Sequence, residues 1–364
     1  MQKIILSSYD HIANQFYGGG GAVAIHQIAR QLSNDFDVLV LTARYHGSPK
    51  NMYTLDGVKY HSIGPRVFHP QLSQLLFLFV LPAYMQKFEF DLWIESFVPP
   101  LSSLFLPLFT RKPVIGWAHL LSGESMTQKY KIPLFKIYEN ALLPKYSNII
   151  ALTSQSGDII RQITSRPVVT IIGNGIDTKV RSGENNGRKN WLYMGRIDEA
   201  QKGIGLLIKS FENVCKVSDW NLTIAGSGSE VEIYKLKKLI MESKAKDRIQ
   251  YIGKVAGKQK EQLFNQSGAL ILTSRYETQP LVILEAFAHA LPVLVPDIPD
   301  LNWLGVDVVY KSKRTDEDFS KHMHHISTHK GERLLKVKQA LAYSKQFDWE
   351  HISNQYKKLI KEII

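Results

Sequence analysis

The sequence predicts an α/β protein made of two doubly wound domains with parallel sheets. The chain has 364 residues, which is enough for two hydrophobic cores. In both halves, short apolar runs alternate with segments of helical periodicity, as β-α-β units do. Turns that contain glycine follow several of these runs, at the place where such units connect a strand to a helix.

The apolar runs of the N-terminal half are predicted to be strands. The first, residues 3–7, leads through a glycine turn into a helix at 22–32 and a second strand at 37–42. Ser154 is expected to cap the helix that follows one of the later strands. The remaining strands are expected at residues 58–63, 91–94, 113–119, 148–153 and 168–172.

The C-terminal half repeats the alternation. Its strands are expected at residues 191–194, 221–225, 249–253 and 268–273, and a helix at 282–290. The last helix, from about residue 349 to 364, has an amphipathic pattern.

Two carboxylates stand out where the run 268–273 meets the helix 282–290. Glu277 lies on the polar turn, and Glu285 follows eight residues later, about two helical turns along. The first N–H groups of a helix lack internal partners and attract anions. Carboxylates at such a point suit a ligand that has both phosphates and hydroxyls. The alternative is that Glu277 is a helix-end charge and Glu285 belongs to a solvated face.

Two basic residues follow the strand at 191–194. Gly195 allows the chain to turn, and Arg196 and Lys202 lie on the loop after it. Arginine offers bidentate donors and lysine a mobile charge, which together suit a negatively charged group. Alone, two such residues are usually surface charges. Their position after a strand, together with the Glu277 segment, favours a functional role.

These segments resemble those of the family 4 glycosyltransferases, whose fold is GT-B. The stretch from Glu277 to Glu285 is similar to the family's Glu-x7-Glu signature, and Gly195-Arg196 with Lys202-Gly203 is similar to its Gly-Arg…Lys-Gly signature. The resemblance implies two Rossmann-like domains that face a cleft, and transfer of a sugar from a nucleotide donor with retention of configuration. It also implies that no metal and no cofactor are needed, because Arg196, Lys202 and helix N-termini take the metal's place.

The resemblance assigns roles to individual residues. His119, at the end of the run 113–119, matches the family's active-site histidine and joins Glu277, Arg196 and Lys202 as the expected catalytic group. The expected donor-binding residues, besides Arg196, Lys202 and Glu277, are Gly19, Gly20, Gly195, Gly226, Lys254, Val255, Leu281, Val282 and Glu285.

The acceptor is expected to meet the loop before the first glycine turn. Asp10, His11 and Asn14 lie there and could reach an acceptor. One departure from the family concerns the donor sugar: this chain has Thr278-Gln279-Pro280 where the family commonly has Gly-Phe-Gly. Pro280 cannot donate an N–H group, so the identity of the sugar is open.

Composition narrows the class of partner. The net charge of +12 favours anionic partners, and no nucleic-acid motif accompanies it. A single cysteine, Cys215, fits a reducing cytosol. No signal peptide is expected, because residues 4–6 form too short an apolar run. The segment Asp35-Phe36-Asp37 is interpreted as a turn that opens a strand, not as a metal-binding motif.

Two aromatic and basic segments, 68–88 and 132–143, allow two interpretations. The favoured one for 68–88 is a buried helix interrupted near Pro82. The other is a monotopic face that contacts an anionic membrane from the cytoplasmic side.

The expected domains are residues 1–172 for the acceptor, 173–345 for the nucleotide sugar, and a C-terminal helix, 346–364, that packs back on the first domain. The run 181–190 is interpreted as the linker. A UDP-sugar donor is favoured over a GDP-sugar, with a saccharide or lipid-linked acceptor in cell-surface glycan or glycolipid synthesis. A nucleotide-sugar epimerase of the same fold and a non-catalytic partner subunit are the alternatives.

Overall fold

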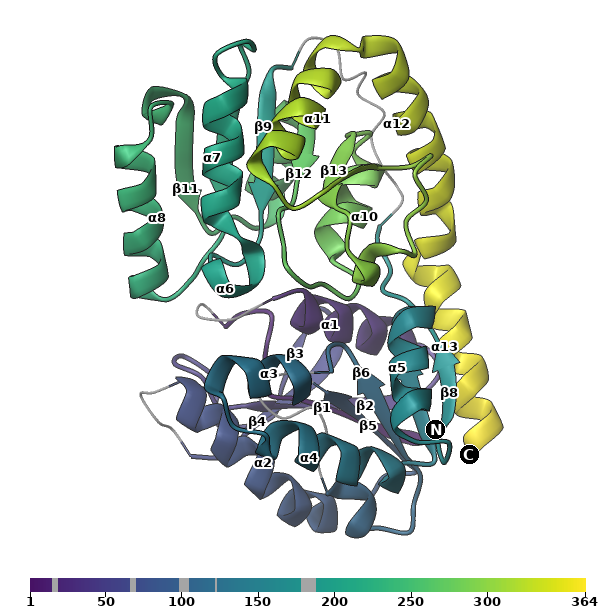
Figure 1. Ribbon diagram of the computed structural model, residues 1–364. Helices are drawn as coiled ribbons and strands as arrows, with labels where there is room; N and C mark the ends of the chain where they lie inside the picture. The colour runs from purple at the N-terminus through teal and green to yellow at the C-terminus, as the bar shows by residue number, and fades with distance from the viewer. Residues whose placement is uncertain (15–18, 66–69, 98–104, 122, 178–187) are drawn as a thin grey trace. The chain divides into compact units, whose positions relative to one another are not determined.

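The structure is a computed structural model that describes residues 1–14, 19–65, 70–97, 105–121, 123–177 and 188–364 (Figure 1). Most of the expected linker, 181–190, therefore lies outside the described residues. The chain divides into two compact units. Unit 1 contains residues 1–174 and 349–364, and unit 2 contains residues 175–348.

Unit 1 is built on an eight-stranded sheet in the order β3-β4-β2-β1-β5-β6-β7-β8. All neighbours are parallel except β3, which pairs antiparallel with β4 at one edge. The strands are β1 (Lys3–Ser8), β2 (Asp37–Ala43), β3 (Tyr53–Leu55), β4 (Val58–Ile63), β5 (Leu92–Phe97), β6 (Val114–Ala118), β7 (Asn148–Ala151) and β8 (Val168–Ile171). The helices are α1 (Gly20–Leu32), α2 (Pro70–Lys87), η1 (Leu106–Leu108), α3 (Gly123–Tyr130), α4 (Leu134–Leu142), η2 (Leu143–Lys145), α5 (Ser154–Ile163) and α13 (Trp349–Ile363).

Helices cover both faces of this sheet. On one face, α2 and α5 pack through Phe77, Leu81 and Ile160 into a core that includes Trp93 and Phe97 of β5. In Figure 1, α2 and α4 lie on the side of the sheet away from α1. The result is the doubly wound arrangement predicted from the sequence.

The C-terminal helix belongs to unit 1. α13 contacts α1, and the ring of Tyr356 lies 5.2 Å from that of Trp117 on β6. Lys357 Nζ pairs with Asp35 Oδ2 at 2.6 Å. Five large side chains of α13 are buried: Trp349, Ile352, Tyr356, Leu359 and Ile360.

Unit 2 has a six-stranded, fully parallel sheet in the order β11-β10-β9-β12-β13-β14. The strands are β9 (Asn190–Met194), β10 (Asn221–Ala225), β11 (Ile249–Gly253), β12 (Ala269–Ile271), β13 (Val293–Pro296) and β14 (Tyr310–Ser312). The helices are α6 (Glu199–Lys202), α7 (Ile204–Val214), α8 (Glu230–Glu242), η3 (Lys246–Arg248), α9 (Gly257–Gln266), α10 (Leu281–Ala288), η4 (Pro299–Leu301), α11 (Asp316–Thr328), α12 (Lys330–Ser344) and η5 (Lys345–Phe347).

Two local predictions are wrong. α2 runs without a break through Pro82, because losing one backbone donor leaves the other hydrogen bonds of a long, packed helix in place. The cap of α5 is Thr153 and not Ser154: the Thr153 hydroxyl accepts a hydrogen bond from the N–H of Ser156 at 3.1 Å. The Ser156 hydroxyl lies 3.1 Å from the Thr153 N–H and completes a reciprocal capping box.

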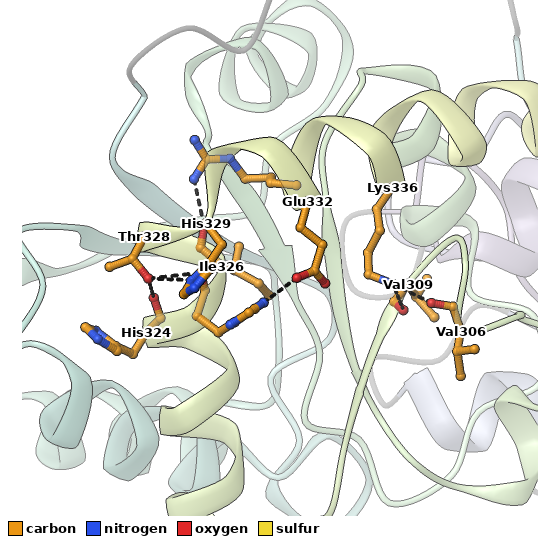
Figure 2. A network of polar contacts seen from close by, with 10 residues as sticks. Val306, Val309, His324, Ile326, Thr328, His329, Glu332 and Lys336 are labelled. Carbon is orange, nitrogen blue, oxygen red and sulfur yellow. Dashed lines mark hydrogen bonds and ion pairs between the residues drawn. The ribbon is translucent and has the colours of Figure 1, made fainter.

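Side-chain contacts fix the corner between α11 and α12 (Figure 2). Glu332 Oε2 lies 2.6 Å from Nε2 of His325, whose ring stacks on that of His329 at 4.0 Å. Lys336 donates to the carbonyl of Val306 and lies 4.7 Å from the ring of Tyr310. Because these groups bond to one another, we assign the histidine-rich corner a structural role.

No helix in the described part of the chain combines the length and the apolar character needed to cross a membrane.

A carboxyl group is buried in the core of unit 1. Glu95 on β5 is 1% exposed; its Oε2 accepts a hydrogen bond from the Tyr146 hydroxyl, and its Oε1 has no partner among the described residues. Burial raises the pKa of Glu95 to about 8, against the smaller, lowering effect of the Tyr146 hydrogen bond. The group is therefore protonated in the folded chain well above the pH at which it ionises in the unfolded chain.

This burial predicts a pH effect on stability. Between its usual pKa of 4.5 and about 8, Glu95 holds a proton in the folded state that it loses in the unfolded state. Stability therefore falls as pH rises through this window. Relative to Glu95→Gln, the wild-type free energy of unfolding should decrease between pH 5 and pH 8, measured by urea denaturation. Other titrating groups are common to both proteins and cancel in the difference, so parallel pH curves would contradict the assignment.

Candidate active site

The strand order of unit 2 reverses direction between β9 and β12. In open parallel sheets, ligands bind outside the carboxyl ends of the strands at such a switch point. The loop after β9 carries Arg196 and Lys202, and the loop after β12 carries Glu277. The sheet therefore brings these three predicted residues to one edge.

An ion pair joins the two loops. Lys202 Nζ lies 2.5 Å from Glu277 Oε1, and the two side chains are only 14% and 6% exposed. The hydroxyl of Ser274 donates to the same Glu277 oxygen at 2.6 Å. The carboxylate thus has two donors, and its position depends on both.

Thr273 holds the backbone beneath Lys202. Its hydroxyl lies 2.9 Å from the Lys202 carbonyl oxygen and 3.0 Å from that of Gly203, and it donates to them. Gly203 has a φ of 63°, and a Cβ there would lie 2.8 Å from the Thr273 carbonyl oxygen. This close approach requires glycine between α6 and α7.

The backbone around Glu277 is held from the loop after β13. Asp300 Oδ2 accepts the Glu277 N–H at 2.9 Å, and the Trp303 indole N–H donates to the Thr278 carbonyl at 3.2 Å. Burial raises the pKa of Asp300. These two contacts hold the segment in which this chain departs from the family's glycine-rich pattern.

Arg196 is exposed on the loop after β9. The buried Tyr193 hydroxyl donates to the Arg196 carbonyl at 2.7 Å and holds the loop. Burial and then the Glu277 carboxylate raise the pKa of Tyr193, whereas the Arg196 guanidinium acts in the opposite direction. Both charges therefore lie near one hydroxyl group.

Glycines allow the loops after β9 and β10 to touch. A Cβ on Gly226 would lie 1.7 Å from the carbonyl oxygen of Gly195, and one on Gly228 would lie 2.4 Å from that of Ile197. Close packing of backbones is therefore sufficient to require glycine at 226; its role in donor binding stays a prediction. Lys254 and Val255 follow β11 at the same edge of the sheet.

Glu285 lies on α10 and pairs with a residue that sequence reasoning missed. Lys260 Nζ of α9 lies 2.5 Å from Glu285 Oε1, and the two side chains are 29% and 24% exposed. α10 begins at Leu281, with Val282 in its first turn, and no side chain caps it. Its first N–H groups point to the carboxyl edge of the sheet, where they can meet an anion.

In unit 1, the predicted acceptor residues stabilise their own loop. Asp10 accepts hydrogen bonds from the N–H groups of His11 and Gly19 at 2.8 and 3.1 Å. His11 Nδ1 accepts the Ala13 N–H at 2.9 Å, and its Nε2 lies 3.0 Å from the Tyr53 hydroxyl. Burial lowers the pKa of His11 to about 4, so the ring is neutral.

Asn14 is buried on the same loop, and its N–H donates to the His11 carbonyl at 2.9 Å. Gly19 is the N-cap and Gly20 the first residue of α1. Gly18, which precedes them in the glycine run, lies outside the described residues. Acceptor binding by this loop stays a prediction.

His119 follows β6, at the carboxyl edge of the unit 1 sheet. It is buried, and its ring lies 4.2 Å from that of Trp117. Burial lowers the pKa of His119 to about 3, so the imidazole is neutral near pH 7. Its Nε2 has no hydrogen-bond partner among the described residues, which leaves one polar atom for a ligand.

The structure therefore joins Lys202 directly to Glu277 and places Arg196 nearby, whereas His119 belongs to the other unit. Thr273, Asp300 and Lys260 were missed. Asp300 follows the apolar run 291–296 and could have been found by that position; Lys260 has no motif around it. Over the described residues, no group of three His, Cys, Asp or Glu side chains could hold a metal ion.

Breaking the Lys202–Glu277 pair should destabilise unit 2. Lys202→Met leaves a buried carboxylate without its cation, which costs about 3 kcal/mol or more. Glu277→Gln added to it should recover much of that loss. Urea denaturation followed by tryptophan fluorescence measures both. The matched control is Lys235→Met, which breaks an exposed pair with Glu232 and should change stability little. Equal losses of stability from the two lysine substitutions would contradict the larger contribution expected of the buried pair.

Comparison with known proteins identifies the family. The family model "Glycosyltransferase Family 4" matches residues 18–180, and "Glycosyl transferases group 1" matches residues 176–327. GDP-mannose:cellobiosyl-diphosphopolyprenol alpha-mannosyltransferase from Xanthomonas oryzae pv. oryzae is 23% identical over 248 residues. That match covers 66% of this chain and 64% of the relative, just under two-thirds of the relative's length.

Solved structures agree on the fold. Sucrose-phosphate synthase from Thermosynechococcus elongatus has a TM-score of 0.86 at 17% identity, and the match covers 100% of this chain and 99% of that one. Anabaena HepE in complex with UDP and glucose has a TM-score of 0.75 at 16% identity, with 100% of both chains covered. The two family models together extend from residue 18 to residue 327, and this chain belongs to the family 4 glycosyltransferases of the GT-B fold.

Proposed function

We propose that this chain is a retaining, metal-independent glycosyltransferase that moves a sugar from a nucleotide-sugar donor to a saccharide or lipid-linked acceptor. The observation that carries the proposal is the Lys202–Glu277 pair at the switch point of the unit 2 sheet, with Arg196 on the loop that leads to Lys202. Cations suit the diphosphate of the donor, and a carboxylate suits the hydroxyls of a sugar. The switch point is where open parallel sheets bind ligands.

The cations take the role that a metal has in other transferases. As the glycosidic bond breaks, the leaving diphosphate gains negative charge. Arg196, Lys202 and the first N–H groups of α10 stabilise that charge. To reach the phosphate, the Lys202 ammonium exchanges part of its contact with Glu277 for contact with the diphosphate. The carboxylate released in this way can accept a hydroxyl group of the donor sugar.

Transfer with retention takes place on one face of the sugar. The acceptor attacks on the side from which the diphosphate leaves, and the leaving phosphate takes the proton of the acceptor hydroxyl. Glu277 orients the sugar and stabilises positive charge on its ring. His119, with a neutral imidazole and an Nε2 that has no partner among the described residues, contributes a hydrogen bond to a sugar hydroxyl. No covalent intermediate on the protein is involved.

The donor in this proposal is a UDP-sugar, with a GDP-sugar as the second choice. HepE, bound to UDP and glucose, shares the fold, whereas the Xanthomonas relative is named for GDP-mannose. Glu285 accepts the ribose hydroxyls in either case, once Lys260 yields part of its contact. Thermal shifts with UDP, GDP and their sugars distinguish the two, since a ligand of the folded state raises the melting temperature.

The acceptor belongs to cell-surface glycan or glycolipid synthesis. The Xanthomonas relative is named for an acceptor with a diphosphopolyprenol group, which supports a lipid-linked acceptor here. Such an acceptor is presented at a bilayer, so the proposal places the protein on the cytoplasmic side of a membrane, in peripheral contact with anionic lipid. The net charge of +12 supports that contact.

Removing the cations should weaken nucleotide binding. Arg196→Ala and Lys202→Ala each delete a charge-assisted contact, so we expect UDP or GDP affinity to fall about ten- to a hundredfold. Isothermal titration calorimetry measures this. If both variants keep wild-type affinity and turnover, the phosphate assignment fails. Conversion of donor alone into an epimer would support an epimerase instead, and failure of the wild type to bind any nucleotide would support a non-catalytic subunit.

Glu277 and Glu285 should separate into sugar and nucleotide roles. Glu277→Gln should lower turnover without weakening nucleoside diphosphate affinity, because its contact in the bound state is with the sugar. Glu285→Ala should instead weaken affinity for the whole donor and for the diphosphate alike. The anomeric coupling constant of the product, measured by NMR, tests retention. A β-linked product from an α-linked donor would overturn the retaining mechanism.

A further inference from the structure

Helix α2 is apolar on two opposite sides, and only one of them is covered. Phe77, Leu81 and Met85 form a stripe with a spacing of four residues that packs into the core of unit 1, each at most 3% exposed. Phe79, by contrast, is 70% exposed, and Leu72 is 43% exposed. A helix that is apolar all round belongs in a protein core or in contact with lipid.

The exposed side of α2 continues onto two further elements. Gln86 near the end of α2 donates to the Phe109 carbonyl at 2.9 Å, which places the end of η1 beside α2. The ring of Phe105 lies 5.4 Å from that of Tyr138 on α4. We name as the α2–α4 face the nine exposed side chains of these elements: Leu72, Leu75, Phe79, Phe105, Leu108, Phe109, Ile132, Leu134 and Ile137.

A large share of the exposed apolar side chains of the described residues lies on this face. All three exposed phenylalanines of the described residues lie on it, with exposed fractions between 40% and 70%. Isolated apolar residues on a protein surface are ordinary, but a contiguous patch marks a contact with another molecule or with a membrane. α2 and α4 lie on the same side of the unit 1 sheet (Figure 1).

The charges around the face are mostly basic. The segments 72–87, 105–112 and 131–138 contain five basic residues and no acidic residue. The basic residues are Lys87, Arg111, Lys112, Lys131 and Lys136. Lys136 pairs with Glu124 at 2.7 Å, and both side chains stay more than half exposed, so water weakens that pair. A patch of aromatic and aliphatic side chains with a basic rim is complementary to anionic lipid.

We infer that the α2–α4 face docks on the surface of an anionic lipid bilayer. Its phenylalanine, leucine and isoleucine side chains enter the boundary between headgroups and acyl chains, and the lysine and arginine side chains contact anionic headgroups. A protein partner is the less favoured occupant, because basic residues outnumber acidic ones around the face and a partner's cations would find few carboxylates to pair with. This face specifies which part of the protein makes the membrane contact of the proposed function. It rests on that function only for the lipid-linked acceptor.

Flotation of the full chain with vesicles tests the inference. Wild-type protein should float with vesicles that contain phosphatidylglycerol and much less with pure phosphatidylcholine, and salt should weaken its binding. The double substitution Phe79→Ser and Ile137→Ser should reduce the bound fraction about tenfold or more, because it removes two apolar side chains from the lipid contact. Lys131→Gln with Lys136→Gln should reduce the preference for anionic vesicles.

A matched control removes apolar surface elsewhere. Val231 and Tyr234 on α8 are 61% and 70% exposed, and Val231→Ser with Tyr234→Ser should leave flotation unchanged. The inference is overturned if wild-type protein binds neither vesicle at low salt, if the α2–α4 variants float like wild type, or if the control loses binding equally. Concentration-dependent dimerisation without vesicle binding would assign the face to a second copy of the chain.

The nucleotide readout keeps this inference separate from the proposed function. Thermal shifts with UDP and GDP should be the same in wild type and in all three double variants, because none of the substituted residues belongs to the nucleotide site. Flotation without any nucleotide binding would remove the proposed function and leave the membrane face. Nucleotide binding without flotation would leave the proposed function and remove the membrane face. The lysine variants leave the apolar packing intact and therefore test the face even if the serine variants fold poorly.

Discussion

The ion pair between Lys202 and Glu277 depends on the parallel sheet of unit 2. The two residues are far apart in sequence, and they meet because β9 and β12 are neighbours that point the same way. Taking both charges from water is costly, and their mutual attraction offsets that cost only at close range. The surrounding contacts keep the ammonium and the carboxylate close together: Thr273 bonds to the backbone at Lys202, and Ser274 bonds to the Glu277 carboxylate.

The same pair shapes the chemistry proposed for the site. A diphosphate attracts the lysine away from the carboxylate, so binding of the donor and release of Glu277 are coupled. A carboxylate that is bonded to lysine in the empty site and free when the donor is bound suits a group that must accept a sugar hydroxyl. Because Asp300 holds the Glu277 backbone, the carboxylate can change partner while its loop stays in place.

Much of the fold could be predicted because its strands are buried on both faces. Such strands are continuous apolar runs, and the run at 221–225 coincides with β10. The errors are local. Pro82 predicted a break, but the packing of α2 on the core outweighs the loss of one hydrogen bond. The choice between Thr153 and Ser154 as a cap depends on backbone angles that sequence does not show.

The site could be predicted only for residues that directly follow the ends of strands. Polar residues after apolar runs, such as Arg196 and Glu277, can be recognised because parallel strands share an edge. Lys260 could not, because its contact with Glu285 depends on how α9 packs beside α10. His11 has a structural role that its position did not show: both of its ring nitrogens have partners within unit 1.

The α2–α4 face shows why an apolar pattern alone leaves function open. The sequence of α2 contains two apolar stripes, and periodicity cannot tell which of them the sheet covers. The structure settles this, because Phe77, Leu81 and Met85 of α2 are buried in the core, whereas Phe79 is mostly exposed. The second stripe contributes nothing to that core and exposes apolar surface to water. Contact with lipid would remove the exposed stripe from water, which is favourable for apolar surface. The basic residues beside the stripe favour lipids with negative charge.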